Sequence, residues 1–345
     1  MALQRRSALR GRCREAWPVL LCACAAALTA RFQAALFCSP VPHAVEGSKL
    51  FSPPLRSRGV GESRGLPHLH AAHALRPQRV GPGVKRSALI TVPLTIVNIA
   101  PPCLGFWRAE YGVSYGYGLA MALSGAWLLF AETRALSWAV ALHVACLCIY
   151  GVRLSVFLLY RELCIPRFQE FRNRIEQRSK DRGTRLKRFP FLFCCGLLYL
   201  GLAAPASLAV AAADSVGKSA LYQGAVALMY IGWFVAALAD TWKSVAKSTQ
   251  GQDALVTGGP FALLRHPNYT GEQLMWTASF VAGCCACASL PLRSSWVAAL
   301  LSGLGVAGIL FVLMQATRGL EMRQMEKYGT DDKYQQWRGR TWAGL

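Results

Sequence analysis

Long apolar runs separated by short polar connections dominate the chain from about residue 115 onward. Most of them approach the roughly 20 residues that a helix needs to cross a hydrocarbon core of about 30 Å. The runs lie at 115–131, 135–160, 190–213, 220–240, 272–290 and 295–316. This pattern predicts an all-α protein, a multi-span transmembrane helical bundle with six spans in this part of the chain.

The segment 88–107 is also apolar, but prolines interrupt it. Pro93 and the pair Pro101 and Pro102 remove backbone donors and restrict the chain to conformations that break a regular helix. We expect a broken span or a piece that lies on the membrane surface. The bundle therefore has six spans, or seven if 88–107 also crosses.

The composition agrees with an integral membrane protein. Apolar residues make up 54% of the chain, charged residues only 16%, and the mean hydropathy is +0.30. A soluble domain rarely needs so many apolar residues for its core. The bilayer is therefore one expected partner, and we expect no nucleic-acid partner, while the oligomeric state is left open.

Residues 1–87 differ from the rest and predict a targeting leader that is mostly disordered. They hold 14 Lys and Arg against three acids. An apolar run at 17–30 follows five arginines, which is the layout of a signal peptide, and the Arg-rich segment 31–86 is similar to a transit peptide. Such a two-part leader is typical of plastids bounded by extra membranes, with a plain presequence or a signal anchor as alternatives. We expect the membrane domain to span 88–345 and to lie in a plastid or endoplasmic reticulum membrane.

The remaining charges gather on one side of the predicted bundle. Segment 161–188 holds ten Lys or Arg against four acids, segment 241–268 holds three basic residues, and the tail from 317 holds six. Counting crossings returns all three to the same compartment, which the positive-inside rule assigns to the cytosol or stroma. For segment 161–188, topology alone is a sufficient explanation. In the other two segments a bound anion, or anionic lipid headgroups, would also use the charges.

The 13 cysteines do not predict a metal site. Most of those beyond residue 88 lie inside apolar runs, without the paired CxxC or His spacing of a zinc site. We expect them to be small buried hydrophobic residues.

The run from Gly258 to Glu272 places several polar side chains at the start of an apolar stretch. Polar groups at such a border are costly unless they contact a partner. Arg265 offers a fork of donors for phosphate or carboxylate, His266 titrates near neutrality, and Asn268 and Tyr269 can bond to a ring or amide. The pattern predicts a polar ligand at the membrane surface.

The neighbouring segments allow comparison with a known family. Ala239–Lys247 lies upstream, and Leu320–Gly329 lies downstream. Together with the Arg-His-Pro-Asn-Tyr-Thr-Gly-Glu motif, they resemble the steroid 5-alpha-reductase-like membrane family, in particular its branch of uncharacterised bacterial and plant proteins. The resemblance covers roughly 115–345 and is most specific at 239–276. Gly151–Arg161 is similar to a span of that branch that ends in Arg.

The resemblance implies an NADPH-dependent reductase with a cytosol- or stroma-facing cofactor pocket and a lipid-like enone substrate, such as a steroid, entering from the bilayer. Basic side chains would neutralise the cofactor phosphates through charge-assisted hydrogen bonds, and the cofactor itself would supply the hydride. The candidate cofactor-binding residues are Asp240, Lys243, Lys247, Arg265, His266, Asn268, Tyr269, Glu272, Trp276, Glu321, Arg323, Lys327, Tyr328 and Tyr334. No residue in 88–160 clearly matches the catalytic Tyr or Glu of that family, so the catalytic residues are not predicted.

Two departures weaken the substrate prediction. The acidic pair usual after Tyr160 and Arg161 is absent, and the chain ends without the expected proline-containing finish. Steroid, polyprenol and fatty enoyl substrates all stay open.

Two other functions remain as alternatives. Membrane methyltransferases of the isoprenylcysteine or phospholipid type also carry a Gly-Pro-aromatic run before Arg-His-Pro, as at Gly259–Pro267. The extra basic residues fit a phosphorylated dinucleotide better than the positive sulfonium of S-adenosylmethionine. The other alternative is a non-enzymatic lipid-binding membrane protein that retains the pocket.

Overall fold

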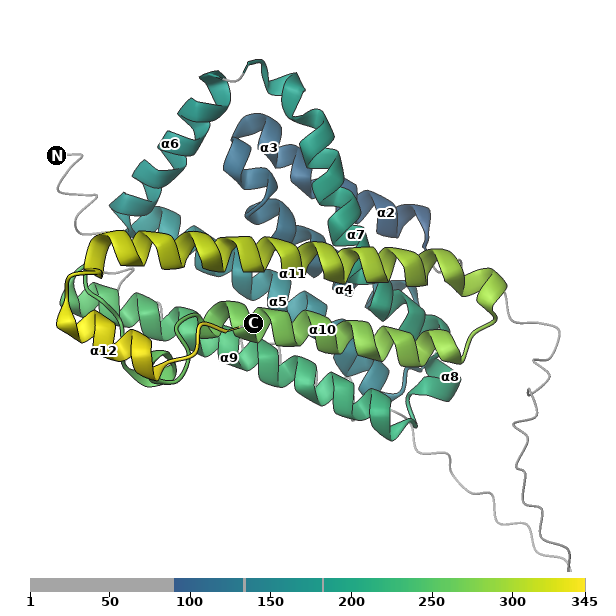
Figure 1. Cartoon of the computed structure of the whole chain (residues 1–345). Helices are drawn as coiled ribbons and strands as arrows, with labels where there is room; N and C mark the ends of the chain where they lie inside the picture. The colour runs from purple at the N-terminus through teal and green to yellow at the C-terminus, as the bar shows by residue number, and fades with distance from the viewer. Residues whose placement is uncertain (1–89, 133–134, 182, 345) are drawn as a thin grey trace, which may run out of the picture. The chain divides into compact units, whose positions relative to one another are not determined.

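The computed structural model describes residues 90–132, 135–181 and 183–344, which belong to one compact unit (Figure 1). The predicted leader at 1–87 lies outside these residues. The described chain is helical, with no β-strand apart from an isolated parallel bridge between Leu264 and Trp342. Its elements are α2 (Val92–Ile99), η1 (Pro101–Cys103), α3 (Leu104–Trp107), η2 (Ala109–Gly112), α4 (Tyr115–Ala131), α5 (Trp138–Cys164), α6 (Pro166–Asp181), η3 (Arg185–Arg188), α7 (Phe189–Ala211), α8 (Ala213–Val216), α9 (Ala220–Gln250), η4 (Gly259–Ala262), α10 (Pro267–Ala288), α11 (Leu292–Tyr328) and α12 (Asp332–Arg340).

Five helical segments of the described chain are long and apolar enough to cross a membrane. They are Ala109–Ala131, Trp138–Cys164, Arg185–Ala211, Ala220–Gln250 and Leu292–Tyr328. Each contains most of an apolar run identified in the sequence. The run at 272–290 forms most of α10, which is helical but is not among the five. A multi-pass membrane protein is therefore supported, whereas a count of six or seven spans stays a prediction.

The segment 88–107 is interrupted, as its prolines predict. Helix α2 ends at Ile99, and Pro101 and Pro102 open the short 3₁₀ turn η1 before α3 begins. Neither proline can donate a backbone hydrogen bond, so the α-helical ladder cannot continue through them. Buried Asn98 at the end of α2 donates hydrogen bonds to the Leu94 carbonyl and to Ser124 Oγ, both at 2.8 Å.

Close helix contacts bring the polar ends of α9 and α10 together. A Cβ atom added at Gly232 would lie 2.6 Å from the Gly271 carbonyl oxygen, so only glycine permits this approach. Figure 1 shows α9, α10 and α11 running alongside one another. As a result, Asp240 near the end of α9 and Asn268 at the start of α10 are hydrogen-bonded at 3.2 Å.

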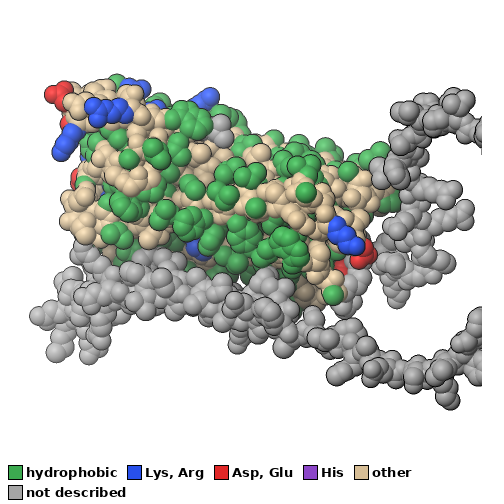
Figure 2. Space-filling view, turned by 90° about the horizontal axis from the view of Figure 1, so that it is seen from below, with side chains coloured by type: hydrophobic (Ala, Val, Ile, Leu, Met, Phe, Trp, Pro, Cys, Tyr) green, Lys and Arg blue, Asp and Glu red, His purple; other side chains and the backbone are tan. Residues whose placement is uncertain are grey.

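One face of the described chain is largely apolar. Hydrophobic side chains cover much of the face shown in Figure 2, and charged side chains lie toward its ends. Large side chains such as Phe130, Phe234 and Leu304 are exposed on the described chain. In water, such a surface would aggregate, whereas in a bilayer these side chains contact lipid.

Candidate functional site

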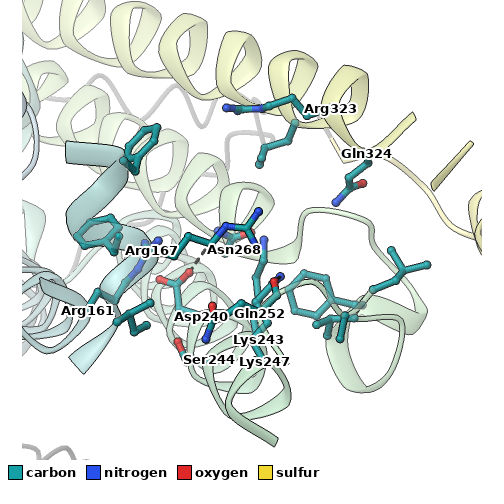
Figure 3. Close-up of a pocket in the computed structure, with 18 of the residues that line it drawn as sticks. Arg161, Arg167, Asp240, Lys243, Ser244, Lys247, Gln252, Asn268, Arg323 and Gln324 are labelled. Atoms are coloured by element: carbon teal, nitrogen blue, oxygen red, sulfur yellow. Dashed lines mark hydrogen bonds between the residues drawn. The ribbon is translucent and has the colours of Figure 1, made fainter. Parts of the chain in front are cut away.

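A cavity of about 620 Å³ lies where the predicted basic segments meet (Figure 3). Its walls come from the C-terminal parts of α5, α9 and α11, from α6, from the connection after α9 and from the start of α10. Polar and charged lining residues are Glu110, Arg161, Arg167, Arg174, Asp240, Lys243, Ser244, Lys247, Gln252, Asn268, Tyr269, Arg323, Gln324, Lys327 and Tyr328. Its volume is within the usual range for a small-molecule or cofactor site.

The lining carries seven Lys or Arg side chains and only two carboxylates, Glu110 and Asp240. Both carboxylates are paired with buried arginines that do not line the cavity. Asp240 accepts a hydrogen bond from Arg153 at 2.7 Å, and Glu110 pairs with Arg172 at 2.8 Å. Arg172 is shared with Glu162, and Asp240 also attracts Arg161 and Lys243, but neither lining acid forms an ion pair with a lining cation.

Two of the seven lining cations, Arg167 and Lys327, form ion pairs with Asp253. This exposed carboxylate accepts a hydrogen bond from Arg167 at 2.6 Å and pairs with Lys327, so it joins α6 to α11 at the cavity rim. Hydrogen bonds from Lys327 and Arg167 lower the pKa of Asp253 to about 2. Its backbone carbonyl also accepts a 2.6 Å hydrogen bond from Tyr328.

Five lining cations form no ion pair with a carboxylate of the described chain: Arg161, Arg174, Lys243, Lys247 and Arg323. Aromatic rings hold two of them in place. The Arg161 guanidinium lies 4.2 Å from the Phe168 ring centroid, and the Lys243 ammonium lies 5.8 Å from that of Phe261. Cations that are placed in this way and form no ion pair with a described carboxylate favour a polyanionic ligand.

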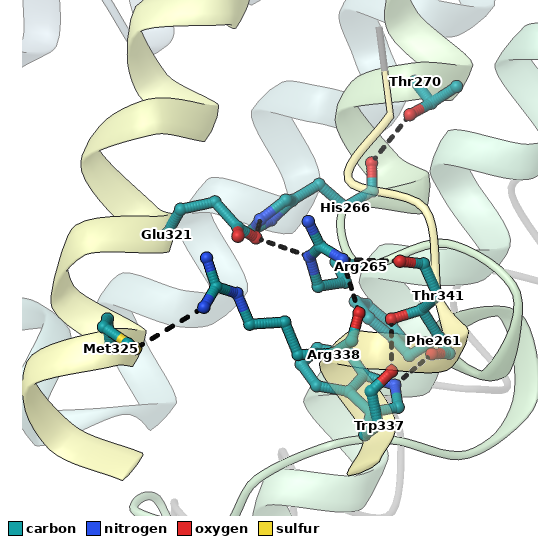
Figure 4. Close-up of polar contacts among 9 residues, drawn as sticks. All are labelled: Phe261, Arg265, His266, Thr270, Glu321, Met325, Trp337, Arg338 and Thr341. Carbon is teal, nitrogen blue, oxygen red and sulfur yellow. Dashed lines mark hydrogen bonds and ion pairs between the residues drawn. The ribbon is translucent and has the colours of Figure 1, made fainter. Parts of the chain in front are cut away.

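Arg265 and His266 belong to a different cluster (Figure 4). Glu321 accepts a hydrogen bond from Arg265 at 3.0 Å and lies 2.6 Å from His266 Nε2. Arg265 also donates to the backbone carbonyls of Arg338 and Thr341, at 3.0 and 2.5 Å. These contacts tie the start of α10 to α11 and to the C-terminal segment, and none of Arg265, His266 and Glu321 lines the cavity.

His266 is only 1% exposed, and burial lowers its pKa below the ordinary value, although Glu321 opposes the shift. A neutral imidazole that hydrogen-bonds to Glu321 is therefore favoured near neutral pH.

Three other predicted site residues also lie away from the cavity. Glu272 is close to Asp240, Arg153 and Tyr150. Trp276 is buried in the bundle core, and Tyr334 packs against Tyr328 and Trp337.

Of the fourteen predicted residues, eight line the cavity and six do not. The eight are Asp240, Lys243, Lys247, Asn268, Tyr269, Arg323, Lys327 and Tyr328, and the six are Arg265, His266, Glu272, Trp276, Glu321 and Tyr334.

Segment 161–188 contributes residues that the sequence reasoning assigned to topology. Arg161, Arg167 and Arg174 all line the cavity, as does Phe168. The excess of basic residues in this segment was a signal for them. Charge counting alone could not separate side chains that face a cavity from those that only orient the protein.

A group of buried polar atoms lies deeper in the bundle. Tyr117, Tyr150 and Trp276 pack with ring centroids 5.3–6.2 Å apart. Their hydroxyl and indole groups are buried and form no hydrogen bond of good geometry in the described chain, although Tyr117 lies close to Tyr150 and Trp276, and Tyr150 lies close to Glu272. Glu272 lies beside Tyr150 and also near Arg153 and Asp240, so polar groups continue from the cavity toward these three rings. Unsatisfied buried donors are rare and call for a ligand, a water or a strained arrangement.

A metal site finds no support within residues 90–132, 135–181 and 183–344, where no three His, Cys, Asp or Glu residues cluster. The nine cysteines of this region are free thiols. Cys146 and Cys195 are buried as expected, whereas Cys103, Cys194 and Cys284 are exposed on the apolar surface.

The chain belongs to the family described as "Protein of unknown function (DUF1295)", whose model matches residues 112–341. The matched region extends from the end of η2 through α12 and contains every cavity-lining residue except Glu110. No curated protein and no solved structure matches the chain. The family description names no activity, cofactor or substrate.

Proposed function

We propose that this member of the DUF1295 family is an integral membrane reductase that uses NADPH to reduce a carbonyl-conjugated C=C bond in a lipid-like substrate. The observation that carries the proposal is the cavity at the polar end of the bundle, with five cations that form no ion pair with a described carboxylate. NADPH has three phosphate groups, which match such a set of donors. When bound, NADPH supplies the hydride, and the reaction also takes up one proton.

The lining residues fit the separate parts of the cofactor. Arg161, Lys243, Lys247 and Arg323 come from three helices and can share the phosphates. Asn268 is held by Asp240, and with Tyr269 it offers amide and aromatic contacts for the nicotinamide and its ribose. The Arg153–Asp240 pair keeps Asn268 oriented, so it acts as a positioning pair.

The buried donors beyond Asp240 do not line the cavity, but they are the groups nearest to it that could contact the polar end of the substrate. Tyr117 and Tyr150 have hydroxyl groups that can donate to a carbonyl oxygen, and Trp276 offers an N–H group. Donors aimed at that oxygen would stabilise the negative charge that develops on it during reduction. We propose Tyr117 and Tyr150 as the donors to the substrate carbonyl, with Glu272 as the neighbouring ionisable group.

The positive charge of the cavity favours the reductase over the methyltransferase. S-adenosylmethionine carries a sulfonium cation, which two already paired lining carboxylates would attract only weakly. A lipid-binding protein without catalysis would need neither Asn268 fixed by Asp240 nor a buried group of hydroxyl and indole donors beside Glu272. We propose lipid-like enones as the substrate class. We propose a plastid or endoplasmic reticulum membrane as the location.

Equilibrium binding to the purified full chain in detergent tests the proposal. We expect NADPH to bind, and to bind more tightly than NADH, because the additional phosphate meets additional cations. S-adenosylmethionine should bind more weakly than either. Binding of S-adenosylmethionine alone would support the methyltransferase instead, and binding of none of the three would support the lipid-binding alternative. Consumption of NADPH with a panel of enone lipids then identifies the substrate.

A further inference from the structure

A second cavity, of about 320 Å³, lies apart from the one proposed for NADPH. It is lined by Trp107, Arg108, Asn173, Glu176, Gln177, Lys180 and Arg185. These residues come from the end of α3, the position between α3 and η2, the second half of α6 and the start of η3. Figure 1 shows α3 within the angle that α6 and α7 form. No residue lines both cavities.

Glu176, the one acid in this cavity, is already engaged by the protein. Its carboxylate accepts a hydrogen bond from the Ala109 backbone N–H at 2.9 Å and pairs with buried Arg188 at 3.1 Å. Arg188 also donates to the Gly105 carbonyl at 2.9 Å. Although burial opposes the shift, these contacts lower the pKa of Glu176. Glu176 therefore holds α6, η2 and η3 together, and Arg188 offsets its charge.

Three cations remain around the cavity. Arg108 has a long contact of 3.9 Å with Glu162, and Lys180 and Arg185 form no ion pair with a carboxylate of the described chain. Asn173 on α6 adds an amide donor, and so does Gln177, although the Gln177 amide also donates to Asp181 at 3.3 Å. This set of groups fits a phosphate, which Arg binds through its fork and Lys through its point charge.

The surroundings of the cavity are apolar and exposed. Trp107 is 64% exposed, Leu186 77% and Phe189 57%. Leu186 and Phe189 lie at the beginning of the candidate span Arg185–Ala211. Aromatic and basic side chains at the end of a span are typical of the interface between hydrocarbon and headgroups. An occupant of this cavity would therefore have acyl chains beside it.

We propose that this second cavity binds the phosphate headgroup of an anionic membrane phospholipid, whose acyl chains pack on Trp107, Leu186 and Phe189. Charge complementarity selects an anion, and the apolar border selects a lipid over free phosphate. The inference is independent of the reductase, because it uses other residues and another part of the fold.

The test compares two double variants of the full chain in detergent. Lys180→Gln with Arg185→Gln removes two lining cations, whereas the matched control Arg178→Gln with Lys187→Gln removes two exposed cations from the same elements, α6 and η3, outside the cavity. The probes are brominated dioleoyl phosphatidylglycerol, brominated dioleoyl phosphatidylcholine and inorganic phosphate. The signal is the quenching of Trp107 fluorescence by the bromine atoms. It is obtained by subtracting the fluorescence of the Trp107→Phe variant from that of the protein with Trp107.

We expect phosphatidylglycerol to quench Trp107 at lower concentration than phosphatidylcholine. In the lining variant, the affinity for phosphatidylglycerol should fall by at least about tenfold, since each basic residue near an anionic headgroup contributes appreciably to binding. The control should weaken it by less than about threefold. Inorganic phosphate at the same concentration should not displace the lipid.

Three outcomes would overturn the proposal. Equal losses in both double variants would mean diffuse attraction without a site. Equal quenching by phosphatidylcholine would mean that the cavity does not select charge. Displacement of the lipid by inorganic phosphate at a concentration similar to that of the lipid would mean that the cavity binds a soluble anion. If the lining variant does not purify, the charge-preserving variant Lys180→Arg with Arg185→Lys must bind as the wild type does, and the single change Arg185→Gln must weaken binding.

Discussion

Arg153 on α5 donates a 2.7 Å hydrogen bond to Asp240 on α9, and the Arg153 side chain is only 7% exposed. The pair joins two helices next to the proposed cofactor cavity, which Asp240 lines. Asp240 also accepts a hydrogen bond from Asn268 and so fixes the orientation of that side chain. Removing one member of a buried ion pair leaves a charge without compensation, which is far more costly than removing both.

The first prediction concerns this pair. Asp240→Ala should lower the free energy of unfolding by about 3 kcal/mol, because Arg153 stays buried without its counter-charge. The double change Arg153→Met with Asp240→Leu should recover most of that loss. Thermal unfolding in detergent measures both. If the double variant is as unstable as the single, the pair does not act as a coupled unit.

The second prediction concerns Lys243, which lines the cavity without a carboxylate partner in the described chain. Lys243→Gln should weaken NADPH binding by about 1–3 kcal/mol, the range for a hydrogen bond to a charged group. Lys218→Gln is the control, because Lys218 is exposed in the connection between α8 and α9 and lines neither cavity. Equal affinities in the two variants would remove Lys243 from the cofactor site.

The third prediction concerns Asp253, which occupies Arg167 and Lys327 at the cavity rim. Asp253→Asn should free both cations and tighten NADPH binding about twofold to fivefold at low salt, an effect that high salt should reduce. Because the pKa of Asp253 is about 2, the carboxylate is fully charged throughout pH 5–9, so the change should not depend on pH there. Titrations at two salt concentrations test this, and weaker binding would show that Asp253 orders the rim instead of competing with the ligand.

The fourth prediction follows from the lowered pKa of buried His266. The unfolded chain takes up a proton near the ordinary pKa of about 6.5, whereas the folded chain does so only at lower pH. Stability should therefore be unaffected by this group above pH 6.5 and should fall as the pH drops from there to the folded-state pKa. His266→Gln, which cannot titrate, should lack that part of the decline. Melting temperatures of both proteins between pH 8 and pH 5 measure the difference, and parallel curves would contradict it.

The fifth prediction concerns Arg265, which the sequence motif suggested as a cofactor ligand. In the structure it bonds to Glu321 and to two C-terminal carbonyls. Arg265→Ala should therefore cost about 2–3 kcal/mol of stability, since it leaves charged and carbonyl acceptors unsatisfied. Affinity for NADPH should change less than threefold. A large loss of affinity with normal stability would return Arg265 to the cofactor site.

Much of the helical framework follows from the sequence. The apolar runs at 115–131 and 190–213 correspond closely to α4 and α7, and Pro101 and Pro102 mark the break after α2. The first and last residues of these helices are predictable because a helix is a local structure. Its length follows from the length of the apolar run and from residues that cannot continue its hydrogen bonds. The sequence likewise indicated three basic segments on one side, and residues of all three line the same cavity.

The role of each polar residue could not be obtained in the same way. Lys243 and Arg265 are similar as sequence signals, yet one faces the cavity and the other pairs with Glu321, 56 residues away along the chain. Arg161 belongs to a segment that topology alone explained, and it lines the cavity beside Phe168. A charged side chain is free for a ligand only if no protein partner lies opposite it, and that depends on helices far apart in sequence.

By itself, then, the sequence determined the helical class, the approximate helix limits and the side on which basic residues gather, because hydrophobic length and charge bias act locally. Tertiary packing alone decided that Asp240 and Glu110 pair with buried arginines, that five lining cations form no ion pair with a carboxylate of the described chain, and that a second basic cavity forms between α3, α6 and η3. The physical reason is that electrostatic pairing depends on distance in space, and only close helix contacts such as that of Gly232 with Gly271 set those distances.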